Sequence, residues 1–317
     1  MNKDSKIFIA GHAGMVGSSF VRGLKNEGYT NLVTRSRPEL DLTDQSRVKE
    51  FFLTERPDYV IIAAGKVGGI MANNSYPAEF IYSNLQILSN IIHYSWLSKV
   101  RKLLLIACSC IYPKMCPQPM KEEQLLSGPL EPTNEPFALA KIAGVSMCQS
   151  YNRQHGTDFI SLVSTNLYGP GDDFNPETSH LVPGLISKFH QTKVSGRSSV
   201  TLWGTGTPRR EFMHVDDLCA AGVFLMGNYN NSEIINVGVG EDRSVKEFAE
   251  IIAKIVGFEG KILFDQTKPD GAPRKLLDNT KMKNLGWSPR IDLETGINAT
   301  YRWYKEHVFQ KASRGRG

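Results

Sequence analysis

The sequence has no apolar run long enough to cross a membrane, which would take roughly 20 predominantly apolar residues in a helix. Its 317 residues are 41% hydrophobic and 22% charged, as is ordinary for a soluble globular chain. The N-terminal stretch "MNKDSKIFIAGHAG" does not read as a signal peptide, because its apolar part is short and leads directly into a Gly-rich turn. We therefore expect a soluble, cytoplasmic protein with no membrane partner.

Cysteines are few, and patterns that would hold a metal are missing. An odd number of unevenly spaced cysteines favours a reducing compartment over a disulfide framework. The triplet "CSC" and the cysteine after it lack the usual zinc spacing, and no matching His/Cys pair occurs elsewhere. We expect no metal site. The five cysteines are Cys108, Cys110, Cys116, Cys148 and Cys219.

The sequence also lacks a basic stripe studded with aromatic residues, so nucleic acid is not an expected partner. The formal net charge of +5 is modest. A basic rim that attracts anionic small molecules is the better interpretation of this charge.

Short apolar runs alternate with amphipathic ones in the first half of the chain. This alternation predicts buried parallel strands separated by helices, and so a Rossmann-type doubly wound α/β sheet. Gly156 fits the residue that follows a helix end. We expect strands at 6–11, 31–34, 59–65, 102–107 and 158–169, and helices at 15–27, 44–54, 77–98 and 136–155.

After Gly169 the regular alternation of strands and helices ends, and shorter, irregular elements predict a smaller mixed α/β lobe. A chain of this length has room for two lobes, which we place at 1–170 for the cofactor and at 171–317 mainly for the substrate, with crossings between them. The loop "YGPGDDFNPETSH" is of the functional type, and the tail "KASRGRG" reads as disordered. We expect helices at 181–192, 244–257 and 291–308, and short strands in "VTLWG", "REFMHV" and "KILFD".

Three glycines directly after the first buried strand predict a dinucleotide site. Gly11, Gly14 and Gly17 in "IAGHAGMVGSS" suit a tight turn, close approach of the backbone to a pyrophosphate, and helix–strand packing. The expected cofactor contacts of this turn also include His12, Ala13, Met15 and Val16, and those of the loop after the third strand include Ala63 and Ala64.

The second strand indicates which cofactor binds. A site that prefers NAD usually has an acidic residue here for the ribose 2′-hydroxyl. This chain has Arg35 and Arg37 instead, and guanidinium groups suit a 2′-phosphate, so we expect NADP(H). Two solvated surface arginines are the alternative, which fits either residue singly better than the pair in this place.

Motifs along nearly the whole chain, from about residue 6 to 305, resemble the GDP-L-fucose synthase branch of the extended short-chain dehydrogenase/reductases. Two of them, "KVGGI" and "WGTGTPRREF", are specific to that branch. The others are "GHAGMVGS", "PAEFIYSNL", "SCIYPK", "LEPTNEPFALAKIAG", "QSYNRQHG", "TNLYGP" and "KPDGAPRKLLD".

The resemblance implies a two-part reaction on GDP-4-keto-6-deoxy-D-mannose: epimerisation at C3 and C5, followed by reduction at C4 with NADPH. The family's Cys and His, which move the C3 and C5 protons, fall on Cys110 and His180. Both residue types can titrate near neutral pH. Without the resemblance, a small buried cysteine and a surface histidine would be the simpler interpretations.

The same match shows two departures at the reduction step. Lys141 is present, but Phe137 stands at the position of the proton-donating Tyr and Cys108 at that of the supporting Ser. Phenylalanine has no O–H and a thiol is a poor donor. We therefore expect epimerisation to survive better than reduction. An engineered Tyr→Phe change and a natural loss of reduction both fit Phe137.

Further residues are assigned by the match. Ala13 stands where the family often has a basic residue, so binding of a 2′-phosphate depends more on the two arginines. The family also implies a homodimer, through the long helices at 77–98 and 136–155. The nucleotide sugar is expected at Lys188, Trp203, Arg210 and Asp270, and the nicotinamide end of the cofactor at Thr165, Asn166, Leu167, Lys141 and His180.

Two competing interpretations stay open. One is another nucleotide-sugar epimerase or dehydratase, such as a 4-epimerase that retains NAD; the arginine pair and the Cys110/His180 pair argue against it. The other is a non-catalytic homologue that binds a nucleotide sugar. Phe137 and Cys108 favour that second interpretation. The retained Cys110, His180 and Lys141 argue against it.

Overall fold

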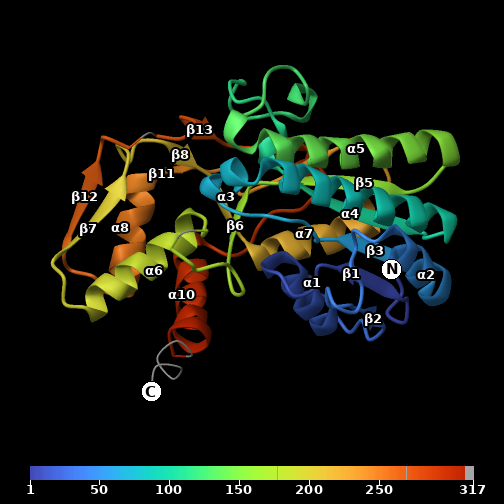
Figure 1. Ribbon diagram of the computed structural model, residues 1–317, viewed down its shortest axis with the longest axis horizontal. Helices are drawn as coiled ribbons and strands as arrows, with labels where there is room; N and C mark the ends of the chain where they lie inside the picture. The colour runs from blue at the N-terminus through green and yellow to red at the C-terminus, as the bar shows by residue number, and fades with distance from the viewer. Residues whose placement is uncertain (177, 269, 311–317) are drawn as a thin grey trace.

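A computed structural model describes residues 1–176, 178–268 and 270–310 (Figure 1). Its centre is a six-stranded sheet in the order β10-β5-β4-β3-β1-β2, and every pair of neighbours is parallel. The strands are rich in Ile, Leu and Val and buried along most of their length, as expected for a sheet covered on both faces. They are β1 (Ile7–Ala10), β2 (Leu32–Val33), β3 (Tyr59–Ile62), β4 (Lys102–Cys108), β5 (Phe159–Ser164) and β10 (Ile235–Val237).

Helices cover both faces of this sheet because successive strand residues point to opposite sides. In β1, Phe8 packs toward α2, α4 and α5, whereas Ile7 and Ile9 pack toward α1 and α7. The doubly wound α/β fold is confirmed. On the first face lie α2 (Gln45–Glu55), α4 (Pro77–Leu97) and α5 (Glu135–His155), and on the second α1 (Met15–Asn26) and α7 (Val215–Asn228).

The other end of the molecule holds a separate core of aromatic and aliphatic side chains around α6, α8 and α10 (Figure 1). Strands β7 and β12 pair in parallel at its edge. Its elements are α6 (Leu181–Val194), β7 (Ser199–Trp203), α8 (Val245–Val256), β12 (Lys261–Asp265) and α10 (Leu293–Tyr304).

Short elements complete the described chain. Strand β6 (Asn166–Tyr168) pairs with β9 (Phe212–His214), and β8 (Arg209–Arg210) lies between β11 (Arg243–Ser244) and β13 (Arg274–Lys275). No helix in the described part of the chain is both long and apolar enough to span a membrane. The remaining elements are α3 (Ile70–Ser75), α9 (Thr280–Asn284), 3-10 turns at Ser109–Ile111, Glu122–Gln124 and Pro132–Asn134, and a π turn at Lys305–Phe309.

The structure differs from the sequence-based expectations in three places. The single strand expected at 158–169 is broken into β5 and β6. Thr165 still donates its N–H to the carbonyl oxygen of Val237 in β10, but the chain then turns away and β6 pairs with β9. Helix α7 and strand β10 were not anticipated. The last helix ends at Tyr304 and continues as a π turn, and the predicted disordered tail at 311–317 lies outside the described residues.

The return of α7 and β10 to the central sheet is a crossing between the two expected lobes. Helix α7 packs against α1, and β10 pairs with β5. The lobe boundary at residue 170 stays a prediction. The end of α5 is confirmed: Gly156 has a left-handed φ of 66° and donates its N–H to Asn152.

Candidate active site

The Gly-rich turn between β1 and α1 is shaped so that a side chain would not fit. Gly11 has a φ of +83°, and a Cβ on it would lie 2.7 Å from the backbone of Ala64. A Cβ on Gly17 would lie 2.1 Å from the carbonyl oxygen of Gly11. The turn therefore packs directly on the residues that follow β3. No side chain caps the start of α1, and its first turn has no acidic residue, so its N–H groups can receive a pyrophosphate.

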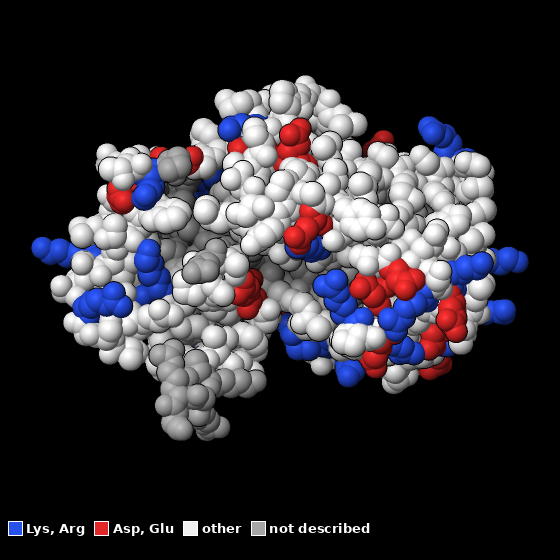
Figure 2. Space-filling view, in the orientation of Figure 1, with Lys and Arg blue, Asp and Glu red and all other residues white. Residues whose placement is uncertain are grey.

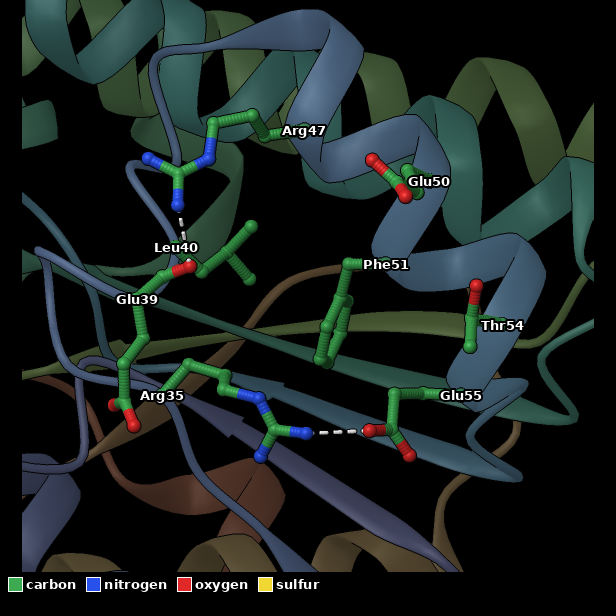
Figure 3. Close-up of a pocket in the computed structure, with 8 residues that line it drawn as sticks. All are labelled: Arg35, Glu39, Leu40, Arg47, Glu50, Phe51, Thr54 and Glu55. Atoms are coloured by element: carbon green, nitrogen blue, oxygen red, sulfur yellow. Dashed lines mark hydrogen bonds and ion pairs between the residues drawn. The ribbon is translucent and has the colours of Figure 1, made fainter.

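The two arginines expected at a 2′-phosphate differ in their freedom. Arg35 forms a close ion pair with Glu55 of α2 and donates to its neighbour's carbonyl oxygen at 2.9 Å (Figure 3). Arg37 has a side chain that is 84% exposed, with Asp41 at 3.6 Å. Figure 2 shows basic and acidic side chains intermingled over this end of the molecule. The pair as a phosphate site stays a prediction, and Arg37 is its more exposed member.

The hollow that Figure 3 shows lies between α2 and the loop after β2, and it contains none of the predicted catalytic residues. Arg47 crosses its rim and donates to the carbonyl oxygen of Glu39 at 2.7 Å. A hydrogen bond from Ser36 holds the pKa of the Glu39 carboxyl below its usual value, with His12 of the Gly-rich turn adding a smaller electrostatic effect. This hollow is adjacent to the expected cofactor turn.

Helix α5 places Lys141 one turn after Phe137, over the end of β4. The ammonium of Lys141 is buried, donates to the carbonyl oxygen of Ile106 at 3.0 Å, and lies 5.7 Å from the centre of the Phe137 ring. Burial lowers the pKa of Lys141, and the nearby Cys108 and Cys110 oppose that shift. The Phe137 ring packs edge-on against Phe80 at 6.4 Å. Phe137 therefore supplies ring packing but no hydroxyl, and its correspondence to the family's Tyr stays a prediction.

Cys108 ends β4, and the following 3-10 turn brings Cys110 back to it. Their sulfur atoms lie 2.8 Å apart. The hydrogen bond from the Cys110 thiol lowers the pKa of Cys108 to about 7, and Lys141 contributes to this shift. The same hydrogen bond, together with burial, raises the pKa of Cys110 well above its usual value. Near neutral pH the two sulfurs can therefore share one proton and one negative charge.

His180 stands at the start of α6, in extended backbone and exposed to solvent. Partial removal of the imidazole from water by the surrounding protein lowers its pKa, and the charge of Asp173 opposes the shift. The N–H of Gly69 donates to the carbonyl oxygen of Thr178, just before His180, at 3.1 Å. The carbonyl oxygen of His180 accepts from the N–H of Gly184 at 3.0 Å, but its imidazole has no hydrogen bond or ion pair with the described residues, so the ring is free to accept or donate a proton.

The residues expected near the nicotinamide make hydrogen bonds and packing contacts that connect neighbouring segments of the protein. The hydroxyl of Thr165 and the side-chain amide of Asn166 both donate to the carbonyl oxygen of Glu211, at 3.1 and 2.9 Å. Leu167 packs at the edge of the core under α1 and α7. A cofactor role for these three residues stays a prediction.

The four expected substrate residues lie around β7 and β8, and each of them has a partner within the protein. Lys188 donates to the carbonyl oxygen of Thr201 at 2.6 Å, and Asp270 accepts from the N–H and the hydroxyl of Thr205 at 3.0 and 2.7 Å. Arg210 donates to the backbone of its neighbour, and burial lowers its pKa although Asp270 is near. Trp203 is 63% exposed, and the ammonium of Lys268 lies over its ring, 5.8 Å from the ring centre. Their substrate roles stay predictions.

Sequence reasoning missed Glu211, a fully buried carboxylate in the centre of this region. Its two oxygens accept from the N–H groups of Gly240 and Leu277, at 2.7 and 3.0 Å. Burial raises its pKa. The available signal in the sequence was an acidic residue directly before the apolar Phe212. If such a carboxylate is buried, it needs fixed hydrogen-bond partners. Glu211 holds three separate segments together beneath the site.

Comparisons with known proteins agree with this geometry. Residues 7–238 match the NAD dependent epimerase/dehydratase family. The chain is 54% identical to GDP-L-fucose synthase 1 of Arabidopsis thaliana over 97% of this chain and 95% of the relative, and 51% identical to the GDP-L-fucose synthase of Escherichia coli (strain K12) over 95% and 97%.

Solved structures have the same architecture. A GDP-mannoheptose C4 reductase from Campylobacter jejuni with NADP bound is 41% identical, with a TM-score of 0.88 over 96% of this chain and 99% of that one. The resemblance read from the sequence motifs is therefore confirmed. By its motifs, its fold and these similarities, the chain belongs to the NAD dependent epimerase/dehydratase family.

Proposed function

We propose that this chain is an enzyme of GDP-L-fucose synthesis that acts on GDP-4-keto-6-deoxy-D-mannose, and that it inverts C3 and C5 more effectively than it reduces C4. The observation that carries the proposal is the contrast between Cys110 and Phe137. The first keeps a thiol that shares a proton with Cys108, and the second has lost the hydroxyl of the reduction step. Relatives that are more than half identical carry the name GDP-L-fucose synthase.

The expected cofactor is NADP(H), which supplies the hydride for C4 when it is bound. The side-chain-free turn at Gly11 and Gly17 would hold its pyrophosphate, and Arg37 its 2′-phosphate. Lys141 would hold the nicotinamide ribose, as the family implies. The Campylobacter jejuni reductase with NADP bound supports this choice of cofactor.

Epimerisation needs a base and an acid that can exchange roles. The 4-keto group makes the C3 and C5 protons acidic, because an enolate can form. The Cys108–Cys110 pair can accept one such proton when it carries a negative charge, and His180 can return a proton because its ring is free. Positioned proton transfer of this kind contributes about 10²–10⁴-fold to a rate.

Reduction of C4 ends with protonation of the new alkoxide. Phe137 cannot donate a proton, and the Cys108 thiol is a weak donor. Lys141 keeps its place beside the ring, where it donates to the carbonyl oxygen of Ile106, but Phe137 has no hydroxyl whose pKa its charge could lower. We infer that the reduction step is slowed by about the factor that a general acid normally contributes, 10²–10⁴-fold.

The test is incubation with GDP-4-keto-6-deoxymannose and NADPH in heavy water, read by mass spectrometry. Deuterium uptake without reduced sugar is the expected result, and Cys110→Ala is expected to abolish that uptake. Rapid formation of reduced, deuterated sugar would contradict the impaired reduction step. A complete lack of uptake would instead favour a non-catalytic homologue.

The proposed assembly is a homodimer through α4 and α5, in a reducing cytoplasm. The two helices pack side by side (Figure 1). Their exposed apolar side chains include Tyr82 at 64%, Leu85 at 36% and Leu139 at 41%. Light scattering should report a dimer that Tyr82→Glu splits. Leu53→Glu, at an exposed leucine of α2, is the matched control and should remain dimeric.

A further inference from the structure

The two thiols of the site form a pair that the fold has already brought together. Their sulfur atoms are 2.8 Å apart, so a covalent bond of about 2.05 Å requires them to approach by about 0.8 Å. The 3-10 turn at Ser109–Ile111 is the cause, because it folds the chain back immediately after β4 ends. All five cysteines are free thiols in the structure.

The two members of the pair differ in the way that stepwise oxidation requires. Cys108 is partly exposed and has the lowered pKa, so it supplies the nucleophilic thiolate. Cys110 is buried beside it and remains protonated, so it is placed to react second. A low-pKa, accessible cysteine next to a second, resolving cysteine is the arrangement found in proteins that sense peroxide.

The other cysteines do not share these properties. Cys148 and Cys219 are buried in the cores on opposite faces of the sheet, and burial raises the pKa of each to about 12. Burial also raises the pKa of Cys116. These three cysteines therefore serve as internal controls.

We propose that Cys108 and Cys110 are an oxidation site, which hydrogen peroxide converts into an intramolecular disulfide. In the first step the Cys108 thiolate attacks peroxide: an S–O bond forms, the O–O bond breaks, the sulfur is oxidised to a sulfenic acid, and hydroxide leaves. In the second step Cys110 loses its proton to that hydroxide and attacks the sulfenic sulfur. The S–S bond forms, the S–O bond breaks, and the oxygen leaves as hydroxide, which takes a proton from the solvent. Overall, one thiolate, one thiol and one hydrogen peroxide give a disulfide, one water and one hydroxide. A dithiol reductant restores both thiols.

The disulfide has a catalytic consequence that rests on the proposed function. Oxidation removes the thiol of Cys110 and the negative charge beside Lys141, so the oxidised protein has no base at this position. Deuterium exchange at C3 and C5 should therefore stop on oxidation and return on reduction.

The experiment begins with reduced protein exposed to a small excess of hydrogen peroxide, quenched with N-ethylmaleimide under denaturing conditions and digested with trypsin. Cleavage after Lys102 and Lys114 releases a peptide, 103–114, that contains both cysteines, whereas Cys116 lies on the next peptide. We expect peptide 103–114 to be unalkylated and lighter than the dithiol form by two hydrogens. Peptides that carry Cys116, Cys148 and Cys219 should remain fully alkylated.

Variants separate the alternatives. Cys108→Ser and Cys110→Ser should each prevent the disulfide, and Cys116→Ser should leave it unchanged. Full alkylation of peptide 103–114 after peroxide, or its cross-linking to the peptide that holds Cys116, would overturn the proposal. Reduced protein that takes up no deuterium would refute the proposed function, while a disulfide in peptide 103–114 would still support the oxidation site.

Discussion

Replacing Phe137 with Tyr should restore reduction, because the surroundings of the missing hydroxyl are intact. The Phe137 ring is half-buried and held edge-on by Phe80, so a Tyr ring can keep the same packing. The Lys141 ammonium lies 5.7 Å from the ring centre, close enough for its charge to lower the pKa of a tyrosine hydroxyl. The free energy of unfolding should change little.

The expected gain in the rate of reduction follows from the rate enhancement that a positioned general acid contributes. A factor of 10²–10⁴ corresponds to about 2.7–5.5 kcal/mol of activation free energy. Because Cys108 remains a weak donor to the same substrate oxygen, we expect Phe137→Tyr alone to reach the lower end, about 10²-fold. The double variant Cys108→Ser/Phe137→Tyr should go further.

The assay follows the loss of NADPH absorbance with GDP-4-keto-6-deoxymannose and identifies the product by mass. Adding Lys141→Met to the Tyr variant is the control: it should remove the gain in reduction, while deuterium uptake should continue but move to higher pH, because Lys141 also lowers the pKa of Cys108. Unchanged reduction in a folded Phe137→Tyr protein that still exchanges deuterium would refute the reasoning. The proton donor would then not be what limits the reduction of C4.

Three further predictions concern the cofactor site and the thiol pair. Gly17→Ala should abolish stabilisation by NADPH in a thermal-shift assay, because its Cβ would meet the Gly11 carbonyl oxygen at 2.1 Å; Gly227→Ala in α7, whose Cβ would meet nothing within 4 Å, is the control and should keep it. Arg37→Ser should weaken NADP binding about tenfold or more with little effect on NAD, since a charged hydrogen bond contributes about 1.5–3 kcal/mol. Arg35→Ser should weaken NADP binding less, because Arg35 is paired with Glu55. Equal losses of NADP affinity in the two variants would contradict the different roles of the two arginines. Deuterium uptake should rise with pH through about 7, because the thiol pair must lose a proton before it can act as a base. Cys108→Ala should move this rise to higher pH, since burial raises the pKa of the remaining Cys110, and an unchanged pH profile would assign the rise to another group.

Several features could be predicted from the sequence because they depend on neighbouring residues. Apolar runs separated by amphipathic helices predicted the parallel sheet, and Gly156 predicted the end of α5. Glycine spacing predicted the tight turn between β1 and α1, since a missing side chain is a local property. Helix α7 and β10 were missed because their place is decided by packing against α1 and pairing with β5, which are far away in the chain.

By itself, the sequence determined the fold class, the family resemblance, and the absence of a hydroxyl at Phe137. The tertiary structure decided which charged and reactive groups meet. It placed Glu55 beside Arg35, put the Glu211 carboxylate between two distant backbone segments, and turned Cys110 back onto Cys108. The reason is physical: residue type sets what a group can do, but its pKa and its freedom to bind depend on its neighbours and its burial, and folding brings those neighbours from distant parts of the chain.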